Sequence, residues 1–175
     1  EVIDCQTCQY SHVVPLPEPV QVEQIYRDEY YTNVKPQYFS RTVEDLEWWN
    51  AVYDEWYEGF ESSLPPDRRR VLDVGCGPGY FLFRGKERGW TTLGIEPSTK
   101  AAAFARSLGL IIRHESLTPS VAGELGTYDV VHLHEVLEHL TDPLGMLQLV
   151  HSLLTPGGLL SVVVPNDYNP LQSLV

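Results

Sequence analysis

One stretch of this chain joins a strand, a glycine turn and an acidic residue in a pattern that can hold a nucleoside. Asp73 lies near the end of an apolar run, and the turn Gly75–Gly79 follows with the spacing Gly-x-Gly-x-Gly. Glycines let the backbone turn tightly and let a ligand approach it. The next helix start adds free N–H groups and a positive dipole end. A later strand ends in Glu96, whose carboxylate can accept hydrogen bonds from ribose hydroxyls.

The spacing of this turn disfavours two other nucleotide-binding motifs. It differs from the GxGxxG spacing of a dinucleotide fold, so an NAD-dependent enzyme is disfavoured. No Lys, Ser or Thr follows Gly79, so the turn is not a P-loop. The turn also lacks a basic residue for a pyrophosphate, whereas Asp73 suits a ligand with an amino group. The alternative is a turn that only packs a helix on a strand, and the combination of Asp73 with Glu96 argues against it.

On these residues the chain resembles the class I S-adenosylmethionine-dependent methyltransferases. Their first motif looks like residues 71–79, and their ribose acid sits where Glu96 sits. The resemblance implies that S-adenosylmethionine is the cofactor. The cofactor-binding residues that we predict are Asp73, Gly75, Cys76, Gly77, Gly79, Tyr80, Glu96, Pro97, Ser116, Leu117 and His134. Many relatives have Gly-Asp before the adenine contact, where this chain has His114-Glu115.

A second candidate for chemistry follows the fourth predicted strand. Residues 132–139 contain three histidines and two glutamates. The last five of them, Glu-Val-Leu-Glu-His, resemble a motif of the ubiquinone-biosynthesis type of small-molecule methyltransferases. The catalytic candidates are His139, Glu138 and His134, because a histidine near its unperturbed pKa can remove a proton from the methyl acceptor.

A divalent metal at this stretch is an alternative that we do not expect. Some relatives hold a metal with Glu-x-x-Glu-His, and the matching ligands here are Glu135, Glu138 and His139. On a helix these three positions would share one face, because they are three and four residues apart. Three ligands with open positions would suit Mg²⁺ or Zn²⁺ polarising a substrate oxygen. The same face would equally suit a pocket wall or a general base.

Composition and charge exclude several classes of partner. The 175 residues carry a net charge of −12, and residues 1–66 hold 13 of the acids but only 3 of the bases. No basic patch could follow a phosphate backbone, so nucleic acid is disfavoured as a partner. No apolar run is long enough to span a bilayer and no signal peptide is visible, so we expect no membrane partner and a cytoplasmic location.

The N-terminal cysteines present a separate question. Cys5 and Cys8 form a CxxC pair, and His12 could add a third zinc ligand, although a tetrahedral site needs four. A free or disulfide-bonded pair is the alternative. Cys76, inside the glycine turn, is interpreted as structural because a small side chain fits there.

Residues 1–66 are predicted to form an N-terminal extension that is mainly helical. Prolines make residues 1–20 irregular, and apolar residues at helical spacing predict one amphipathic helix over 43–61. The tyrosines between 26 and 38 lie in a polar stretch that looks like a loop. Residues 21–61 could act as a lid over the carboxyl edge of the sheet and wall the substrate side.

Residues 67–175 alternate apolar strands with helices, which predicts an α/β fold with a doubly wound parallel sheet. The resemblance implies a Rossmann-like strand order of 3-2-1-4-5 with two further strands, which we expect to be missing here. Strand five would then be an exposed edge, through which a homodimer could form. The predicted function is methyl transfer to a small-molecule acceptor. The alternatives are a catalytically silent S-adenosylmethionine-binding module or a fragment of a larger methyltransferase.

Overall fold

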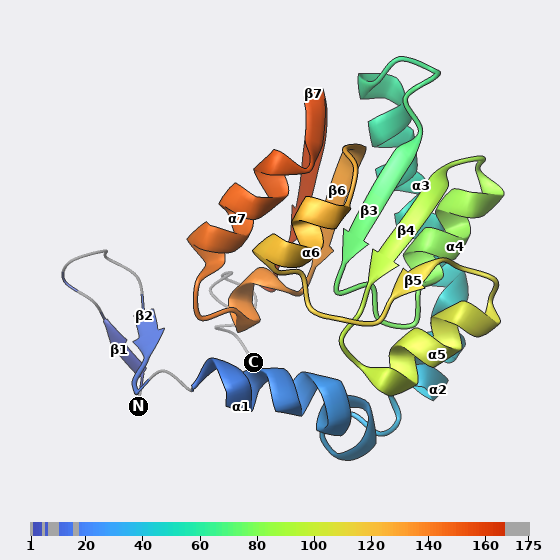
Figure 1. Ribbon diagram of the computed structural model, residues 1–175. Coiled ribbons are helices and arrows are strands. Elements are labelled where there is room, and N and C mark those ends of the chain that lie inside the picture. Colours follow the sequence, from blue (N-terminus) through green and yellow to red (C-terminus); the bar gives the residue numbers. More distant parts are fainter. Residues whose placement is uncertain (1, 5, 7–10, 16–17, 167–175) are drawn as a thin grey trace.

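Five parallel strands form the sheet that positions the glycine turn (Figure 1). The computed structural model describes residues 2–4, 6, 11–15 and 18–166. In spatial order the strands are β5 (Ile112–Arg113), β4 (Thr91–Ile95), β3 (Arg70–Val74), β6 (Tyr128–His134) and β7 (Leu154–Val163). Every neighbouring pair is parallel. Counted along the chain within this sheet, β3 is the first strand and β7 is the fifth. The order therefore confirms the predicted 3-2-1-4-5 sheet of a Rossmann-like fold.

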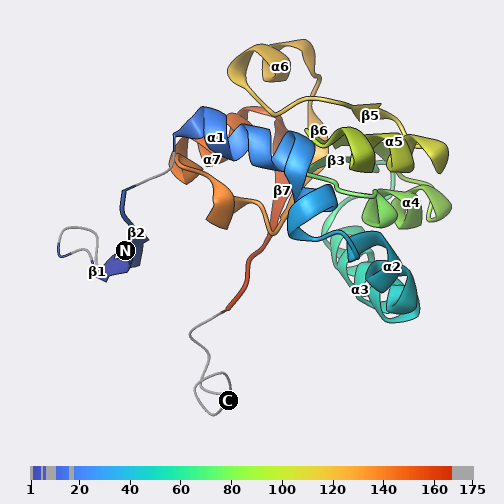
Figure 2. The same ribbon diagram turned by 90° about the horizontal axis from the view of Figure 1, so that it is seen from below.

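Helices cover both faces of the sheet, as a parallel sheet requires (Figure 2). One face packs against α3 (Leu46–Ser63), α4 (Tyr80–Glu87) and α5 (Thr99–Ser107). The other face packs against α6 (Pro119–Glu124) and α7 (Pro143–Ser152). Successive residues of a strand point to opposite faces, so Val71 joins the first core and Leu72 the second. Asp73 therefore shares the face covered by α3 and α4.

Side-chain caps mark the starts of α5 and α7. The Ser98 hydroxyl accepts a hydrogen bond from the N–H of Ala101, and the Asp142 carboxylate accepts one from Gly145. The structure adds a short helix, α6, that the sequence analysis missed. The Thr118 side chain caps this helix, and Pro119 is its first residue. A capping residue followed by proline is a helix start signal that is visible in the sequence.

The N-terminal segment is more regular than predicted. Residues 1–20 were expected to be irregular, but β1 (Val2–Asp4) and β2 (Ser11–Val13) form an antiparallel pair. Pro19 begins a helix rather than preventing one, since proline is tolerated in the first helical turn. This helix is α1 (Pro19–Gln24), and it is followed by the π-helix η1 (Ile25–Val34) and by α2 (Tyr38–Glu44).

The tyrosine-rich stretch is therefore helical, and the loop prediction for it was wrong. Its polar residues hide the helical period, but neighbouring aromatic rings pack in a chain along it, with ring centroids 4.9–5.2 Å apart between Tyr26 and Phe39. The predicted helix over 43–61 is divided at Asp45, where α2 ends and α3 begins. No helix in the described ranges is both long and apolar enough to cross a membrane.

The edge strand β7 pairs only with β6 within the described part of the chain. Leu160 and Val162 on this strand are 42% and 39% exposed. A homodimer formed through this edge stays a prediction.

The helix α3 shares one core with the sheet, since Tyr57 is fully buried and stacks on Phe81 with ring centroids 4.7 Å apart. The division of the chain at residue 66 also stays a prediction.

Gly85 allows α4 to pack closely against Tyr57 of α3, because a side chain at position 85 would overlap the Tyr57 hydroxyl. That hydroxyl donates a hydrogen bond to the backbone carbonyl of Phe81, with an oxygen–oxygen distance of 3.2 Å. The close approach at Gly85 is therefore made by α3. Across the same interface Arg84 forms a two-armed ion pair with Asp54.

We predict that Gly85→Ala lowers the free energy of unfolding by about 1–3 kcal/mol, since the added methyl group displaces Tyr57. Gly59→Ala in α3 is the matched control, because a Cβ there meets nothing within 4 Å. This control should stabilise the protein by about 0.5–1 kcal/mol, since alanine restricts the unfolded chain. Urea unfolding of both variants measures the difference. Equal effects of the two substitutions would contradict the packing role of Gly85.

Candidate functional site

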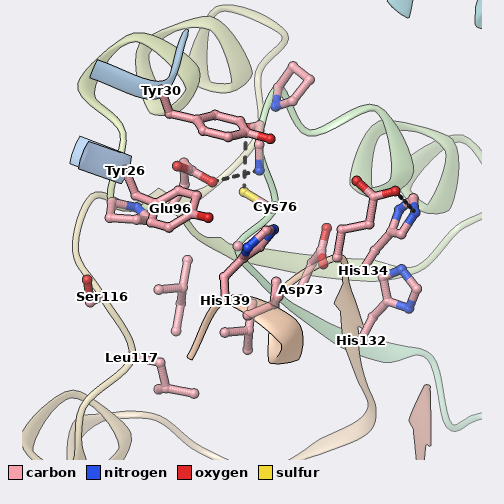
Figure 3. A pocket seen from close by; sticks show the side chains of 18 of the residues that line it. Tyr26, Tyr30, Asp73, Cys76, Glu96, Ser116, Leu117, His132, His134 and His139 are labelled. Carbon is pink, nitrogen blue, oxygen red and sulfur yellow. Dashed lines mark hydrogen bonds and ion pairs between the residues drawn. The ribbon is translucent and has the colours of Figure 1, made fainter. Parts of the chain in front are cut away.

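A cavity of about 350 Å³ opens at the carboxyl ends of the central strands. It lies where the chain order reverses, because β3 has β4 on one side and β6 on the other. Open α/β sheets bind ligands at such a switch point. Figure 3 shows Asp73, Glu96 and His139 around this cavity, with Tyr26 and Tyr30 on the side of the N-terminal helices.

The glycine turn forms the floor of the cavity in a conformation that glycine favours. Gly75, Gly77 and Gly79 have φ values of 74°, 52° and 81°. A Cβ on Gly75 would lie 2.7 Å from a methyl carbon of Val136, and one on Gly79 would lie 2.6 Å from a methyl carbon of Leu110. Gly75 and Gly77 line the cavity, whereas Gly79 packs behind the turn at the start of α4. The spacing of the glycines is thus a steric requirement of the turn.

Glu96 holds the turn in place from the end of β4. One carboxylate oxygen accepts a hydrogen bond of 2.8 Å from the N–H of Gly77, and the other accepts one of 2.8 Å from Ser98. The side chain is buried, and burial raises the pKa of Glu96 to about 7, against the effect of these two bonds. Each oxygen keeps a lone pair that can accept a bond from a ligand hydroxyl.

Asp73 is the second buried acid of the cavity. Burial, and then the nearby charge of Glu96, raise the pKa of the Asp73 carboxyl well above its usual range. No donor among the described residues forms a hydrogen bond with it, and no Lys or Arg of that part of the chain lines the cavity. A ligand amino group would supply the missing donor and positive charge. These residues therefore fit the amino group and ribose of S-adenosylmethionine.

The other predicted cofactor residues lie at different places around the turn. Pro97, Ser116 and Leu117 line the side of the cavity after β4 and β5, and Cys76 and Tyr80 line the side of the turn. The Cys76 sulfur lies 2.6 Å from the position a Cβ on Gly94 would take, so it packs where β4 has no side chain. Burial raises the pKa of the Cys76 thiol. This packing agrees with a structural interpretation of Cys76.

The stretch after β6 does not form the helix face that a metal site would need. Glu135 has a left-handed φ of 53°, and only Leu137–His139 form a short 3₁₀ turn, η2. The helix on which Glu135, Glu138 and His139 would share a face is therefore not formed. His134, Glu135 and His139 line the cavity, whereas Glu138 does not and lies 3.8 Å from the His139 imidazole. The described residues contain no group of three side chains placed to hold a metal ion.

The pair Cys5 and Cys8 lies outside the described residues, so a zinc site there stays a prediction.

His132 is a cavity residue that the sequence analysis did not select. It is the register partner of Asp73 across β3 and β6, and its ring stacks on Phe81 with centroids 4.1 Å apart. Its Nδ1 bonds to the Ser161 hydroxyl at 2.9 Å, and its buried Nε2 has no partner among the described residues. Burial lowers the pKa of His132 to about 3. The period of two along β6 could have placed it beside Asp73.

The N-terminal helices close the cavity, in agreement with the expected position of residues 21–61. Tyr26, Tyr31, Tyr38 and Trp49 are among the residues that line it. The Tyr31 hydroxyl lies 3.1 Å from the position of a Cβ on Gly77, directly over the turn. The Lys100 ammonium of α5 donates a 3.0 Å hydrogen bond to the Tyr31 carbonyl and fixes this segment to the sheet domain.

Comparison with known proteins agrees with this fold and this cavity. A family model described as a methyltransferase domain matches residues 48–174. The chain therefore belongs to this family of methyltransferase domains. A ubiquinone biosynthesis O-methyltransferase of Bordetella avium is 34% identical over 118 residues, which cover 62% of this chain and 47% of that protein. One from Ralstonia nicotianae is 36% identical over 104 residues, which cover 56% and 44%. The chain spans about half the length of these curated relatives.

Solved structures of methyltransferases share the fold. A magnesium protoporphyrin IX methyltransferase from Synechocystis PCC 6803, solved with bound SAM, has a TM-score of 0.61 at 18% identity. That match covers 82% of this chain and 74% of the other. A SAM-dependent methyltransferase from Archaeoglobus fulgidus has a TM-score of 0.55 at 25% identity, over 67% of this chain and 53% of the other.

We predict that S-adenosylhomocysteine binds more tightly as the pH rises from 6 to 8. The Glu96 pKa is about 7 in the free protein, so the carboxyl is neutral below that pH. Ribose hydroxyls donate to the charged form, so binding releases a proton and is weakened when Glu96 is protonated. Glu96→Gln should flatten the pH dependence and weaken binding by about 1–3 kcal/mol.

Calorimetry at three pH values in that range measures this dependence. The difference in slope between the wild type and the variant isolates the contribution of Glu96 from that of Asp73, the other buried acid of the cavity. Identical slopes in the wild type and in Glu96→Gln would contradict the contact between Glu96 and the ribose.

Proposed function

We propose that this chain binds S-adenosylmethionine and transfers its methyl group to a small-molecule acceptor, as a cytoplasmic enzyme. The observation that carries the proposal is the pair of buried acids, Asp73 and Glu96, around a glycine turn in a cavity without a basic side chain from the described residues. Membership of the methyltransferase-domain family supports it. The names of the curated relatives favour an oxygen atom as the methyl acceptor.

The amino group, the ribose and the adenine of the cofactor each have a matching group in the cavity. Asp73 would bind the amino group, and Glu96 would accept hydrogen bonds from the ribose hydroxyls while it still holds Gly77. Pro97 and the segment Ser116–Leu117 would pack on the adenine. The aromatic wall of the N-terminal helices would shield the cofactor from water, and aromatic faces also attract a sulfonium cation.

The chemistry asks the protein for alignment and for one proton acceptor. When bound, S-adenosylmethionine supplies a methyl group that is already electrophilic. The chain must therefore hold the acceptor oxygen in line with that methyl group and take up the hydroxyl proton. His134 is the best-placed base, because it lies at the end of β6 between the rings of Trp49 and Trp56, at centroid distances of 5.5 and 5.3 Å.

The environment of His134 keeps its imidazole ready to accept a proton. Burial lowers the pKa of His134, so the ring is neutral near pH 7. Its Nε2 lies 4.0 Å from a carboxylate oxygen of Glu135, which would stabilise the imidazolium formed after proton transfer. His139 also lines the cavity but packs against Tyr26, with ring centroids 5.3 Å apart. We assign His139 to the pocket wall and Glu138 to the support of its imidazole, 3.8 Å away, and neither of them to proton transfer.

A thermal-shift experiment on the full chain tests the proposed cofactor. S-adenosylmethionine and S-adenosylhomocysteine should each stabilise the protein, by about 2.7 kcal/mol at a concentration 100 times the dissociation constant. NAD should have no effect. Failure of both sulfur nucleotides to stabilise the protein would contradict the proposal. Binding without turnover of any acceptor would favour a catalytically silent module.

We predict that His134→Gln lowers kcat by about 10²–10⁴-fold, since a general base is lost. The affinity for S-adenosylhomocysteine should stay within about twofold of the wild type. His139→Ala serves as the comparison and should lower kcat by less than about tenfold. Methyl transfer to catechol and protocatechuate as probe acceptors measures both variants. The assignment of His134 fails if the two variants lose the same activity.

The role of a metal is tested in the same assay by chelation with EDTA. Because Glu135, Glu138 and His139 do not converge, turnover should be unchanged by the chelator. Loss of turnover that Mg²⁺ or Zn²⁺ restores would contradict this expectation.

A further inference from the structure

A second hollow of about 400 Å³ adjoins the cofactor cavity. It lies between the end of η1 and the start of α3, and α2 forms one of its sides. Tyr38, Thr42 and Trp49 line both spaces, so these three side chains form the wall between the hollow and the cavity. A ligand that extends from the reaction centre would reach the hollow by passing these side chains.

The hollow contains the two bases of the N-terminal segment that have no acidic partner. Residues 18–66 carry three bases, of which Arg27 pairs with Glu23 at 2.9 Å. The other two, Lys35 and Arg41, both line the hollow. Neither forms an ion pair with a carboxylate of the described residues, although Asp45 lines the same hollow. The Lys35 ammonium lies 5.4 Å over the ring of Tyr30, a residue of the cofactor cavity.

Charge is thus divided between the two spaces. The cofactor cavity is lined by four acids, Glu23, Asp73, Glu96 and Glu135, and by no Lys or Arg of the described residues. An anionic group of the acceptor would find no basic side chain of the described residues inside it. In the adjoining hollow the two bases would attract such a group, since both side chains are exposed and the Lys35 ammonium already lies over the Tyr30 ring between the two spaces.

We propose that this hollow binds an oxyanion, a carboxylate or a phosphate, at the far end of the methyl acceptor, and that Lys35 and Arg41 are its ligands. The proposal rests on the proposed methyl transfer. It makes the acceptor an elongated molecule whose methylated atom lies near His134 and whose anionic end lies beyond Tyr38 and Trp49. Asp73 and Glu96 line the cofactor cavity but not the hollow, which favours the acceptor over the cofactor as the ligand of the hollow.

The test compares matched acids and esters on the full chain loaded with S-adenosylhomocysteine. Hydrocaffeate, its methyl ester and its phosphonate analogue are titrated by calorimetry into the wild type and into Lys35→Gln/Arg41→Gln. In the wild type the two acids should bind at least about tenfold more tightly than the ester, as two charge-assisted contacts allow. In the double variant this preference should fall below about threefold, with the ester affinity unchanged. The acid that binds more tightly identifies the oxyanion.

Arg27→Gln is the matched control, because it removes the same charge from the same segment outside the hollow. It should keep the wild-type preference. Equal binding of acid and ester in the wild type would overturn the proposal. So would a loss of S-adenosylhomocysteine affinity in the double variant, which would assign the bases to the cofactor carboxylate. Absence of S-adenosylhomocysteine binding to the wild type would instead contradict the proposed function itself.

Discussion

The carboxylate of Glu96 is the interaction on which the site depends. Its two oxygens join the N–H of Gly77 after β3 to the N–H of Ser98 before α5. Three elements that are separate in the sequence thereby meet at one buried group. Burial makes the charged form of this carboxylate unfavourable in free energy. The same position beside the cavity leaves its remaining lone pairs available to a ligand. A ligand hydroxyl bound there would share its acceptor with the turn, so a substitution of Glu96 would affect both the turn and the ligand site.

The helix α3 ties the N-terminal segment to this site. Tyr57 fills the space left by Gly85 and stacks on Phe81, which in turn stacks on His132 beside Asp73. Arg84 and Arg88 also form ion pairs with Asp54 and Glu61 of α3. Since α2 and η1 precede α3 in the chain, the aromatic wall over the cavity is held where α3 docks.

The acidic character of the chain has a local meaning. Most of the negative charge lies in the N-terminal 66 residues, and acids of this segment meet arginines of α4 at the interface with the sheet domain. The cavity retains acids without bases from the described residues, which suits a cationic or amino-bearing ligand. The adjoining hollow retains two bases, Lys35 and Arg41, that α2 and η1 bring together.

The sequence by itself determined the parallel sheet, the positions of Asp73 and Glu96, and the helix starts at Ser98 and Asp142, because each depends on local spacing and on residue type. Only the tertiary structure decided the helical state of the tyrosine segment, since its rings are ordered by packing on one another and not by a hydrophobic period. Long-range packing likewise set the contact of Gly85 with Tyr57 of α3 and that of Gly77 with Tyr31. Such contacts join residues far apart in the chain, and no local pattern encodes them.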